Sequence, residues 1–94
     1  DTSGSAMFTY TAKRAAELGL ADAATCGAMA RRGYEGIISK AKINSDGLVD
    51  IYDACDGLCV QDSYAAYINY AKKVNAKEAV AAFLWATWIM EKPG

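Results

Sequence analysis

The sequence predicts an all-α fold with three main helices, and three observations lead to this prediction. Apolar residues make up 53% of the 94 residues, which favours a packed structure over a disordered chain. One segment repeats apolar residues at helical spacing, and another, residues 79–90, carries no charge at all. A long stretch, residues 42–74, shows weaker patterning. A chain of this length forms at most one domain, so we expect residues 1–94 to be a single piece without an internal boundary.

The first helix is predicted over residues 3–18. Thr2, Ser3 and Ser5 provide side-chain oxygens for its N-cap, and Gly19 stands where a C-terminal glycine is common. The first half carries no charge, so we expect it to be buried on every side. Helix N-termini favour anions, so the same three hydroxyl residues are candidates for binding a carboxylate, although capping is the simpler interpretation.

The second helix is predicted over residues 23–40 as an amphipathic surface helix. Arg31, Arg32, Glu35 and Ser39 fill one face. Apolar residues recur on the other face at spacings of three and four, which is the period of a helix. They are Ala23, Cys26, Ala30, Tyr34, Ile37, Ile38 and Ala41.

The segment between the second and third helices is predicted to be mostly loop. Residues 44–47, Asn-Ser-Asp-Gly, form a turn signal, and residues 48–53 alternate partly between apolar and polar. A short β-hairpin is the alternative to loop here. Residues 62–70 carry tyrosines at spacings of three and could form a helix, but an irregular structure is our prediction.

The third helix has the clearest predicted start. Asn75 and Glu78 form a capping-box pattern, in which each side chain accepts a hydrogen bond from the other residue's backbone N–H. The helix then runs to Met90 and is apolar all round, so we expect it, with Trp85 and Trp88, in a core. It is too short to span a bilayer.

The predicted order is buried helix, surface helix, long loop, buried helix. In an α/α toroid, helical hairpins alternate inner and outer helices around a ring, and loops at one rim carry the ligand site. The order therefore predicts a partial toroid, because three helices cannot close a ring that uses about twelve helices of ordinary length.

Composition excludes several classes of function. The absence of histidine removes the Ser/His and Cys/His nucleophile pairs and most zinc sites. A net charge of −1 without a basic run argues against nucleic acid and membrane surfaces as partners. Asn44, Asp46 and Asp50 lack the ligand order of a calcium loop, so neither a metal nor a cofactor is predicted. The chain opens on neither Met nor a signal peptide, and we expect it to be a piece of a longer protein.

The long loop holds the remaining candidate side chains. Asp50, Asp53 and Asp56 cluster there, and solvated turn residues are the simpler interpretation than an acid/base pair. Three reduced thiols are expected, with a disulfide between Cys55 and Cys59 as the alternative. Four tyrosines could stack on a sugar ring, although packing against a rim is the simpler interpretation; they are Tyr52, Tyr64, Tyr67 and Tyr70.

Two stretches resemble glycoside hydrolase families 88 and 105. Residues 1–10, Asp-Thr-Ser-Gly-Ser-Ala-Met-Phe-Thr-Tyr, resemble the entry to a late inner helix, and residues 70–86 resemble the last inner helix. The resemblance extends over the segment between them, which supports an irregular structure for residues 62–70. At Ala71 the family pattern leads us to expect proline, so this loop is expected to be less rigid.

The resemblance implies a six-hairpin α/α barrel in a bacterial cytoplasm or periplasm. Such enzymes remove an unsaturated uronic acid from oligosaccharides derived from pectin or glycosaminoglycan, with an aspartate as acid and base. That aspartate lies upstream of the segment matched here, so no catalytic residue is predicted in this chain. The substrate-binding candidates are Thr2, Ser3, Ser5, Tyr64 and Tyr67.

Two functions from different classes follow. The first is the C-terminal fragment of a glycosyl hydrolase, inactive alone, whose parent binds an oligosaccharide. The alternative is a free-standing helical protein-interaction module, and a structural protein descended from such an enzyme is more remote. In either case we expect the isolated chain to form a homo-oligomer, because its apolar helices would otherwise face water.

Overall fold

The three long helices of the protein lie where the sequence predicts them, to within two residues at each end. A computed structural model of the chain describes residues 1–55, 57 and 59–92. The predicted fold class, an all-α chain with three main helices, is confirmed. The helices are α1 (Thr2–Glu17), α2 (Ala23–Ile38), α3 (Tyr64–Ile68) and α4 (Lys77–Glu91).

Four short strands join the second and last helices. The turn signal at residues 44–47 closes an antiparallel hairpin in which Ile43 pairs with Val49, so the hairpin alternative is confirmed. Gly47 has a φ of 79°, a backbone conformation that glycine adopts without strain. The strands pair as β1 (Ala41–Ile43) with β2 (Val49–Ile51), and β3 (Ala54–Cys55) with β4 (Lys72–Lys73).

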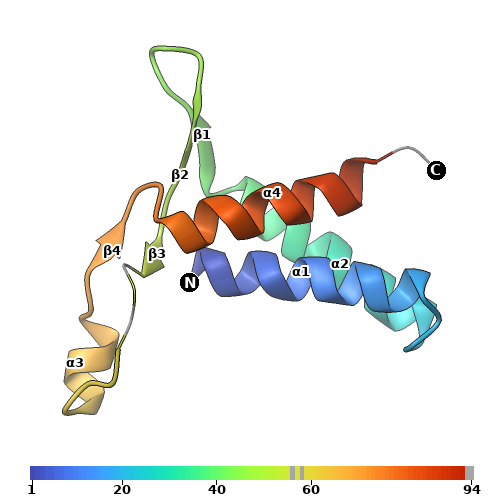
Figure 1. Ribbon diagram of the computed structural model, residues 1–94, viewed down its shortest axis with the longest axis horizontal. Coiled ribbons are helices and arrows are strands. Elements are labelled where there is room, and N and C mark those ends of the chain that lie inside the picture. Colours follow the sequence, from blue (N-terminus) through green and yellow to red (C-terminus); the bar gives the residue numbers. More distant parts are fainter. Residues whose placement is uncertain (56, 58, 93–94) are drawn as a thin grey trace.

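The three long helices form two layers. α1 packs against α4 on one side and against α2 on the other, while α2 and α4 touch little (Figure 1). α1 and α4 run in the same direction, and α2 returns antiparallel to α1 as the second arm of a hairpin (Figure 1). The N-terminal ends of α1 and α4 therefore lie at one end of the molecule, beside β3 and β4. We call this end the rim.

Small residues form most of the core. Ala6 of α1 and Ala79 and Ala86 of α4 are fully buried, so the two helices approach closely. On the other side of α1, Gly33 of α2 lies against Thr9, and a Cβ atom on this glycine would lie 2.3 Å from Thr9 Oγ1. The core cluster comprises Ala6, Ile37, Ile51, Ala54, Ala76, Ala79, Ala82, Phe83 and Ala86.

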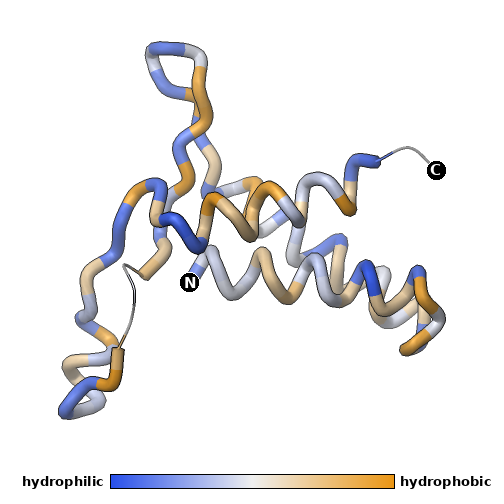
Figure 2. The backbone as a smooth tube through the Cα atoms, viewed as in Figure 1, coloured by the Kyte–Doolittle hydropathy of each residue, from blue (hydrophilic) through white to orange (hydrophobic). Residues whose placement is uncertain are grey.

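The prediction that Trp85 and Trp88 are core residues is wrong. Their exposed fractions are 58% and 53%. α4 packs with its alanines and Phe83 against α1, and no second helix of the described chain covers its other side. α4 therefore exposes large apolar side chains, and Figure 2 shows orange, hydrophobic stretches along its middle between blue, hydrophilic ends. The first half of α1 differs from expectation in the same way, because Met7 and Phe8 are also exposed.

The start of α4 also differs from the prediction. The helix begins after Ala76 without any side-chain cap, so Asn75 and Glu78 form no capping box. Asn75 has a φ of 59°, and its Oδ1 accepts from the backbone N–H of Ile51 at 2.8 Å. Its Nδ2 donates to Asp50 Oδ1 at 2.9 Å. Asn75 thus joins β2 to the start of α4.

The prediction of an irregular structure for residues 62–70 is wrong in part. Residues 64–68 form the short helix α3, which begins at Ser63. The hydroxyl of Ser63 accepts from the N–H of Ala66 at 3.1 Å, an ordinary N-cap. α3 and β4 form an arm that projects from the rim (Figure 1). No helix in the described part of the chain is long and apolar enough to cross a membrane.

Candidate functional site

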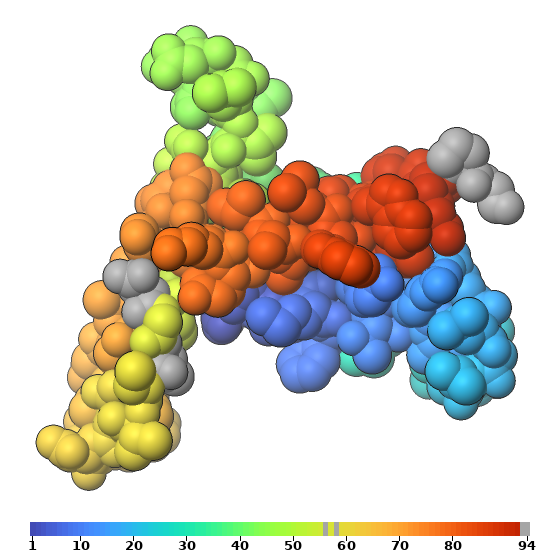
Figure 3. Space-filling model, in the orientation of Figure 1, coloured from blue at the N-terminus to red at the C-terminus, as the bar shows by residue number. Residues whose placement is uncertain are grey.

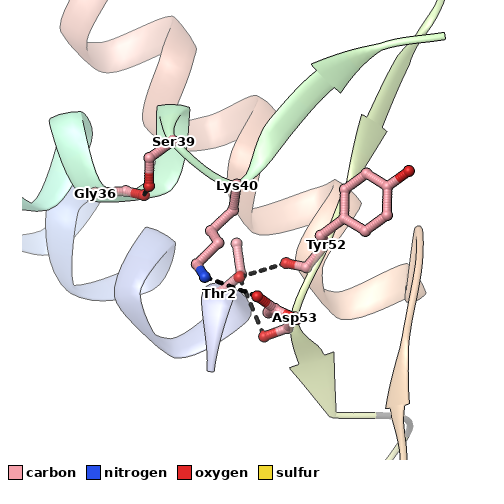
Figure 4. Close-up of polar contacts among 6 residues, drawn as sticks. All are labelled: Thr2, Gly36, Ser39, Lys40, Tyr52 and Asp53. Carbon is pink, nitrogen blue, oxygen red and sulfur yellow. Dashed lines mark hydrogen bonds and ion pairs between the residues drawn. The ribbon is translucent and has the colours of Figure 1, made fainter.

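The first turn of α1 is fastened to the loop that follows β2. Thr2 is buried, and its Oγ1 donates to the carbonyl oxygen of Tyr52 at 2.6 Å, with the carbonyl of Asp53 at 3.1 Å. The backbone N–H of Thr2 also donates to the carbonyl of Asp53 at 3.0 Å. The close-up shows Thr2 pointing to these two carbonyls while the ring of Tyr52 turns away (Figure 4). Thr2 therefore holds the rim together, and its hydroxyl hydrogen is already used within the protein.

Asp1, and not one of the three hydroxyl residues, caps α1. Its carboxylate accepts from the backbone N–H of Ser3 at 3.3 Å and from the Ser3 hydroxyl at 2.7 Å. The same carboxylate accepts from the N–H of Cys55 at 3.2 Å, which joins the helix to β3. Ser3 is buried, so of the three predicted residues only Ser5 is exposed at the rim.

A cavity of about 560 Å³ opens beside the first turn of α1. The end of α2 and the strands β3 and β4 complete its walls. Lys40 and Asp53 form an ion pair at 2.7 Å at its side, in the arrangement seen in Figure 4. The cavity is lined by Asp1, Thr2, Ser5, Arg32, Gly33, Gly36, Ile37, Ser39, Lys40, Asp53, Cys55 and Lys72.

Three cations and two carboxylates meet in this cavity. The hydrogen bond from Lys40 holds the pKa of Asp53 below its ordinary value, and the charges of Lys40 and Lys72 act in the same direction. Asp53 is therefore ionised at neutral pH and has no proton to give as a general acid. With Arg32, the lysines make a polar surface suited to binding an anionic or hydroxyl-rich ligand.

The predicted tyrosines do not reach the cavity. Tyr64 and Tyr67 lie on α3, where 79% and 43% of their surfaces are exposed. The hydroxyl oxygen of Tyr67 accepts from the backbone N–H of Gln61 at 3.0 Å, within the same arm. The structure separates these residues from Ser5, so the predicted candidates form two groups and not one site.

The acidic loop residues have structural roles. Asn44 Oδ1 accepts from the N–H groups of Asp46 and Leu48, which closes the hairpin turn. Asp50 accepts from Asn75, and Asp53 pairs with Lys40. Asp56 lies outside the described residues. The described residues contain no group of three histidine, cysteine or acidic side chains that could hold a metal ion.

Of the three cysteines, Cys55 alone lines this cavity. Cys26, Cys55 and Cys59 are free thiols in the structure. Cys55 contributes to the cavity wall, and Cys59 Sγ lies 3.6 Å from the carbonyl oxygen of Gly57. No cation that would activate a thiolate is hydrogen-bonded to either sulfur among the described contacts.

The basic residues of the cavity were missed by the sequence analysis. Lys40 and Asp53 are thirteen positions apart, and Arg32 and Lys72 come from different elements. No local spacing connects them. Only the antiparallel return of α2 and the pairing of β3 with β4 bring them to one place, so a short motif could not have revealed the group.

The arrangement is that of part of an α/α toroid, in which α1 and α4 are inner helices that share a rim and α2 is an outer helix. Comparisons with known proteins agree with this class of fold. The family model of Glycosyl Hydrolase Family 88 matches residues 1–93. The chain therefore belongs to Glycosyl Hydrolase Family 88. None of the curated proteins matches the chain.

A solved structure supports the fold. The chain is similar to a C. acetobutylicum ATCC 824 glycoside hydrolase from family 105, with a TM-score of 0.86 and 24% sequence identity. The similarity covers 99% of this chain and 28% of that chain. The chain thus spans less than a third of the length of this relative, and the similarity in fold extends over 99% of the chain.

Proposed function

We propose that this chain supplies the C-terminal inner helices and part of the substrate rim of a glycosyl hydrolase. The substrate class is unsaturated uronic-acid oligosaccharides from pectin or glycosaminoglycan. The observation that carries the proposal is the family match over residues 1–93, on a fold in which α1 and α4 begin at one rim. The resemblance of residues 1–10 and 70–86 to inner helices supports the same assignment.

The rim is suited to binding and not to chemistry. Arg32, Lys40 and Lys72 bring positive charge to a cavity beside an exposed Ser5, and a uronate carboxylate is an anion that such groups bind. Asp53 is held ionised by Lys40, so it has no proton to give to a double bond. The role that fits these residues is to hold the acidic sugar while an aspartate elsewhere in the complete enzyme acts.

A chimera tests the proposal. The segment of the C. acetobutylicum enzyme that superposes on this chain is replaced by residues 1–93, and both proteins are assayed on unsaturated rhamnogalacturonyl and glucuronyl disaccharides. Loss of the double-bond absorbance reports turnover. The expected result is a folded chimera that retains measurable turnover of a disaccharide cleaved by the acceptor. A chimera that folds but has lost all such turnover contradicts the proposal.

Two neighbouring arginines provide a matched control within the chimera. Arg32 lines the cavity, whereas Arg31 does not. Arg32→Gln is expected to raise KM several-fold with little change in kcat, because it removes a charge that holds the substrate. Arg31→Gln is expected to leave both constants unchanged. Equal effects of the two substitutions would show that the cavity does not bind the uronate.

A further inference from the structure

One side of α4 carries a regular stripe of exposed residues. Its members follow one another at spacings of three, four, three and four, and we call this stripe the α4 seam. It consists of Glu78, Ala81, Trp85, Trp88 and Lys92. This is the spacing at which helices meet in a coiled coil. The four helical members are exposed, and Lys92 is half-buried. α4 and α1 lie side by side on the face shown in Figure 3.

The seam is next to a hollow between α1 and α4. Its volume is about 510 Å³, and it is lined mainly by Met7, Tyr10, Ala81, Ala82 and Trp85. The ring of Tyr10 meets that of Trp85 edge to face, with centroids 5.2 Å apart, so the indole is already oriented. The small side chain at position 81 leaves the hollow open, and an aromatic side chain fits a space of this size and lining.

We infer that a second copy of this chain binds the α4 seam, with the two α4 helices antiparallel about a two-fold axis at Trp85. Trp85 stands seven residues from Glu78 and seven from Lys92. An antiparallel pair centred on it therefore places Glu78 of each copy opposite Lys92 of the other. In the same register, Trp88 of each copy lies opposite the alanines that open the hollow.

Charge selects this arrangement over a parallel one. Glu78 and Lys92 have opposite signs and close the two ends of an otherwise uncharged seam. A parallel two-fold pair would place like charges together at both ends, which is unfavourable. Lys92 Nζ also bonds Glu17 Oε1 at 3.2 Å and lies 4.9 Å from the centre of the Trp88 ring, so its ammonium group is held near the seam.

The apolar area suits a weak dimer. A buried aromatic side chain covers roughly 150–250 Å². Two tryptophans about half exposed, with Leu84, Met7 and Tyr10, leave roughly 500 Å² for each copy to cover. Two copies together then bury about 1,000 Å², the lower limit for a specific interface. The dimer leaves the rim free, because it uses the sides of α1 and α4. In the complete barrel of the proposed function, neighbouring helices would occupy these sides, so the dimer is a property of the 94-residue chain.

The first measurement is the mass of the 94-residue chain in solution. Sedimentation velocity from about 1 to 100 μM should show one concentration-dependent transition, from the 10.0 kDa chain to twice that mass. Trp88→Ala should raise the dissociation constant at least tenfold. Leu20→Lys, at an exposed apolar residue in the α1–α2 turn, should leave it unchanged. A monomer throughout this range would overturn the inference and leave the seam to helices of a longer chain.

Charge reversal tests the antiparallel register. Glu78→Lys and Lys92→Glu should each weaken the dimer by about tenfold, because each places like charges opposite one another. The double variant should recover most of the affinity. Glu35→Lys on α2 makes the same charge change away from the seam and should have no effect. Circular dichroism verifies that each variant retains its helices, since Lys92 also contacts Glu17. Two weakened single variants without recovery in the double variant would overturn the antiparallel pairing.

Discussion

α1 and α4 lie side by side and run in the same direction, yet their N-terminal ends are held by different means. α1 is capped by its own Asp1, and Thr2 reaches across to two carbonyl oxygens of the loop after β2. α4 has no side-chain cap, and Asn75 beside it bonds to β2 and not to the helix.

A residue that is common at N-caps can bond to a group outside its own helix, so the sequence at a helix start does not determine the partner of that side chain. Both helix starts carry residues that are common at N-caps. In both cases a hydroxyl or amide predicted to serve its own helix instead bonds to residues 50–53. Residues 50–53 therefore support both helix starts at the rim. A substitution that breaks these hydrogen bonds on either helix should destabilise the same loop.

The largest effect is expected at Asn75. Asn75→Ala removes two hydrogen bonds and leaves a left-handed backbone without the side chain that favours it. The free energy of unfolding should fall by about 2–3 kcal/mol. Urea denaturation followed by circular dichroism measures the change.

Asn75→Asp separates this role from helix capping. Asp and Asn cap helices about equally well, so a capping residue would tolerate the change. In the structure described here the new carboxylate would face Asp50, and stability should fall. Adding Asp50→Asn should restore part of the loss. Unchanged stability in the Asn75→Asp protein would favour the capping interpretation.

The packing of α1 against α2 provides the second prediction. A Cβ at Gly33 would lie 2.3 Å from Thr9 Oγ1, whereas one at Gly36 meets nothing within 4 Å. Gly33→Ala should therefore cost about 1–2 kcal/mol despite the better helix propensity of alanine. Gly36→Ala should be neutral or stabilising by up to about 1 kcal/mol. Equal denaturation midpoints for the two variants would contradict the close approach of the helices.

Thr2 should show a smaller effect than Asn75. Thr2→Val keeps the shape of the side chain and removes the hydroxyl that donates to Tyr52, at a cost of about 1 kcal/mol. Thr11→Val removes an exposed hydroxyl that bonds only within its own helix and should change stability by less than about 0.5 kcal/mol. A larger loss for Thr11→Val would mean that the rim does not depend on this clamp.

The smallest effect is a pH dependence at the cavity. Lys40 lowers the pKa of Asp53 in the folded state, so the pair stabilises the fold above the ordinary pKa of an aspartate, about 4. That contribution is lost as pH falls through the lowered value. Lys40→Met should slightly reduce the difference in Tm between pH 7 and pH 3. Lys42→Met, at an exposed residue outside the cavity, is the control, and an equal change in both variants would contradict the pairing.

The sequence predicted the secondary-structure elements better than it predicted which side chains contact one another. The three long helices and the hairpin follow from local periodicity and turn chemistry, which short segments determine by themselves. Asn75 was misassigned because its partner is Ile51, 24 positions away. The sequence around Asn75 does not indicate that a strand lies next to it. Trp85 and Trp88 were placed in a core because a hydrophobic helix does not reveal how many neighbours cover it. The cavity was missed for a similar reason, since Lys40 and Asp53 meet only after the chain has turned.

Turnover by the 94-residue chain alone tests the central claim most directly. In the proposed function the chain contributes to binding the substrate, and Asp53 is held ionised by Lys40 and so has no proton to give. Incubation with unsaturated rhamnogalacturonyl and glucuronyl disaccharides near neutral pH should therefore leave the double-bond absorbance unchanged. Turnover that is proportional to the concentration of the chain and survives repurification would contradict this account.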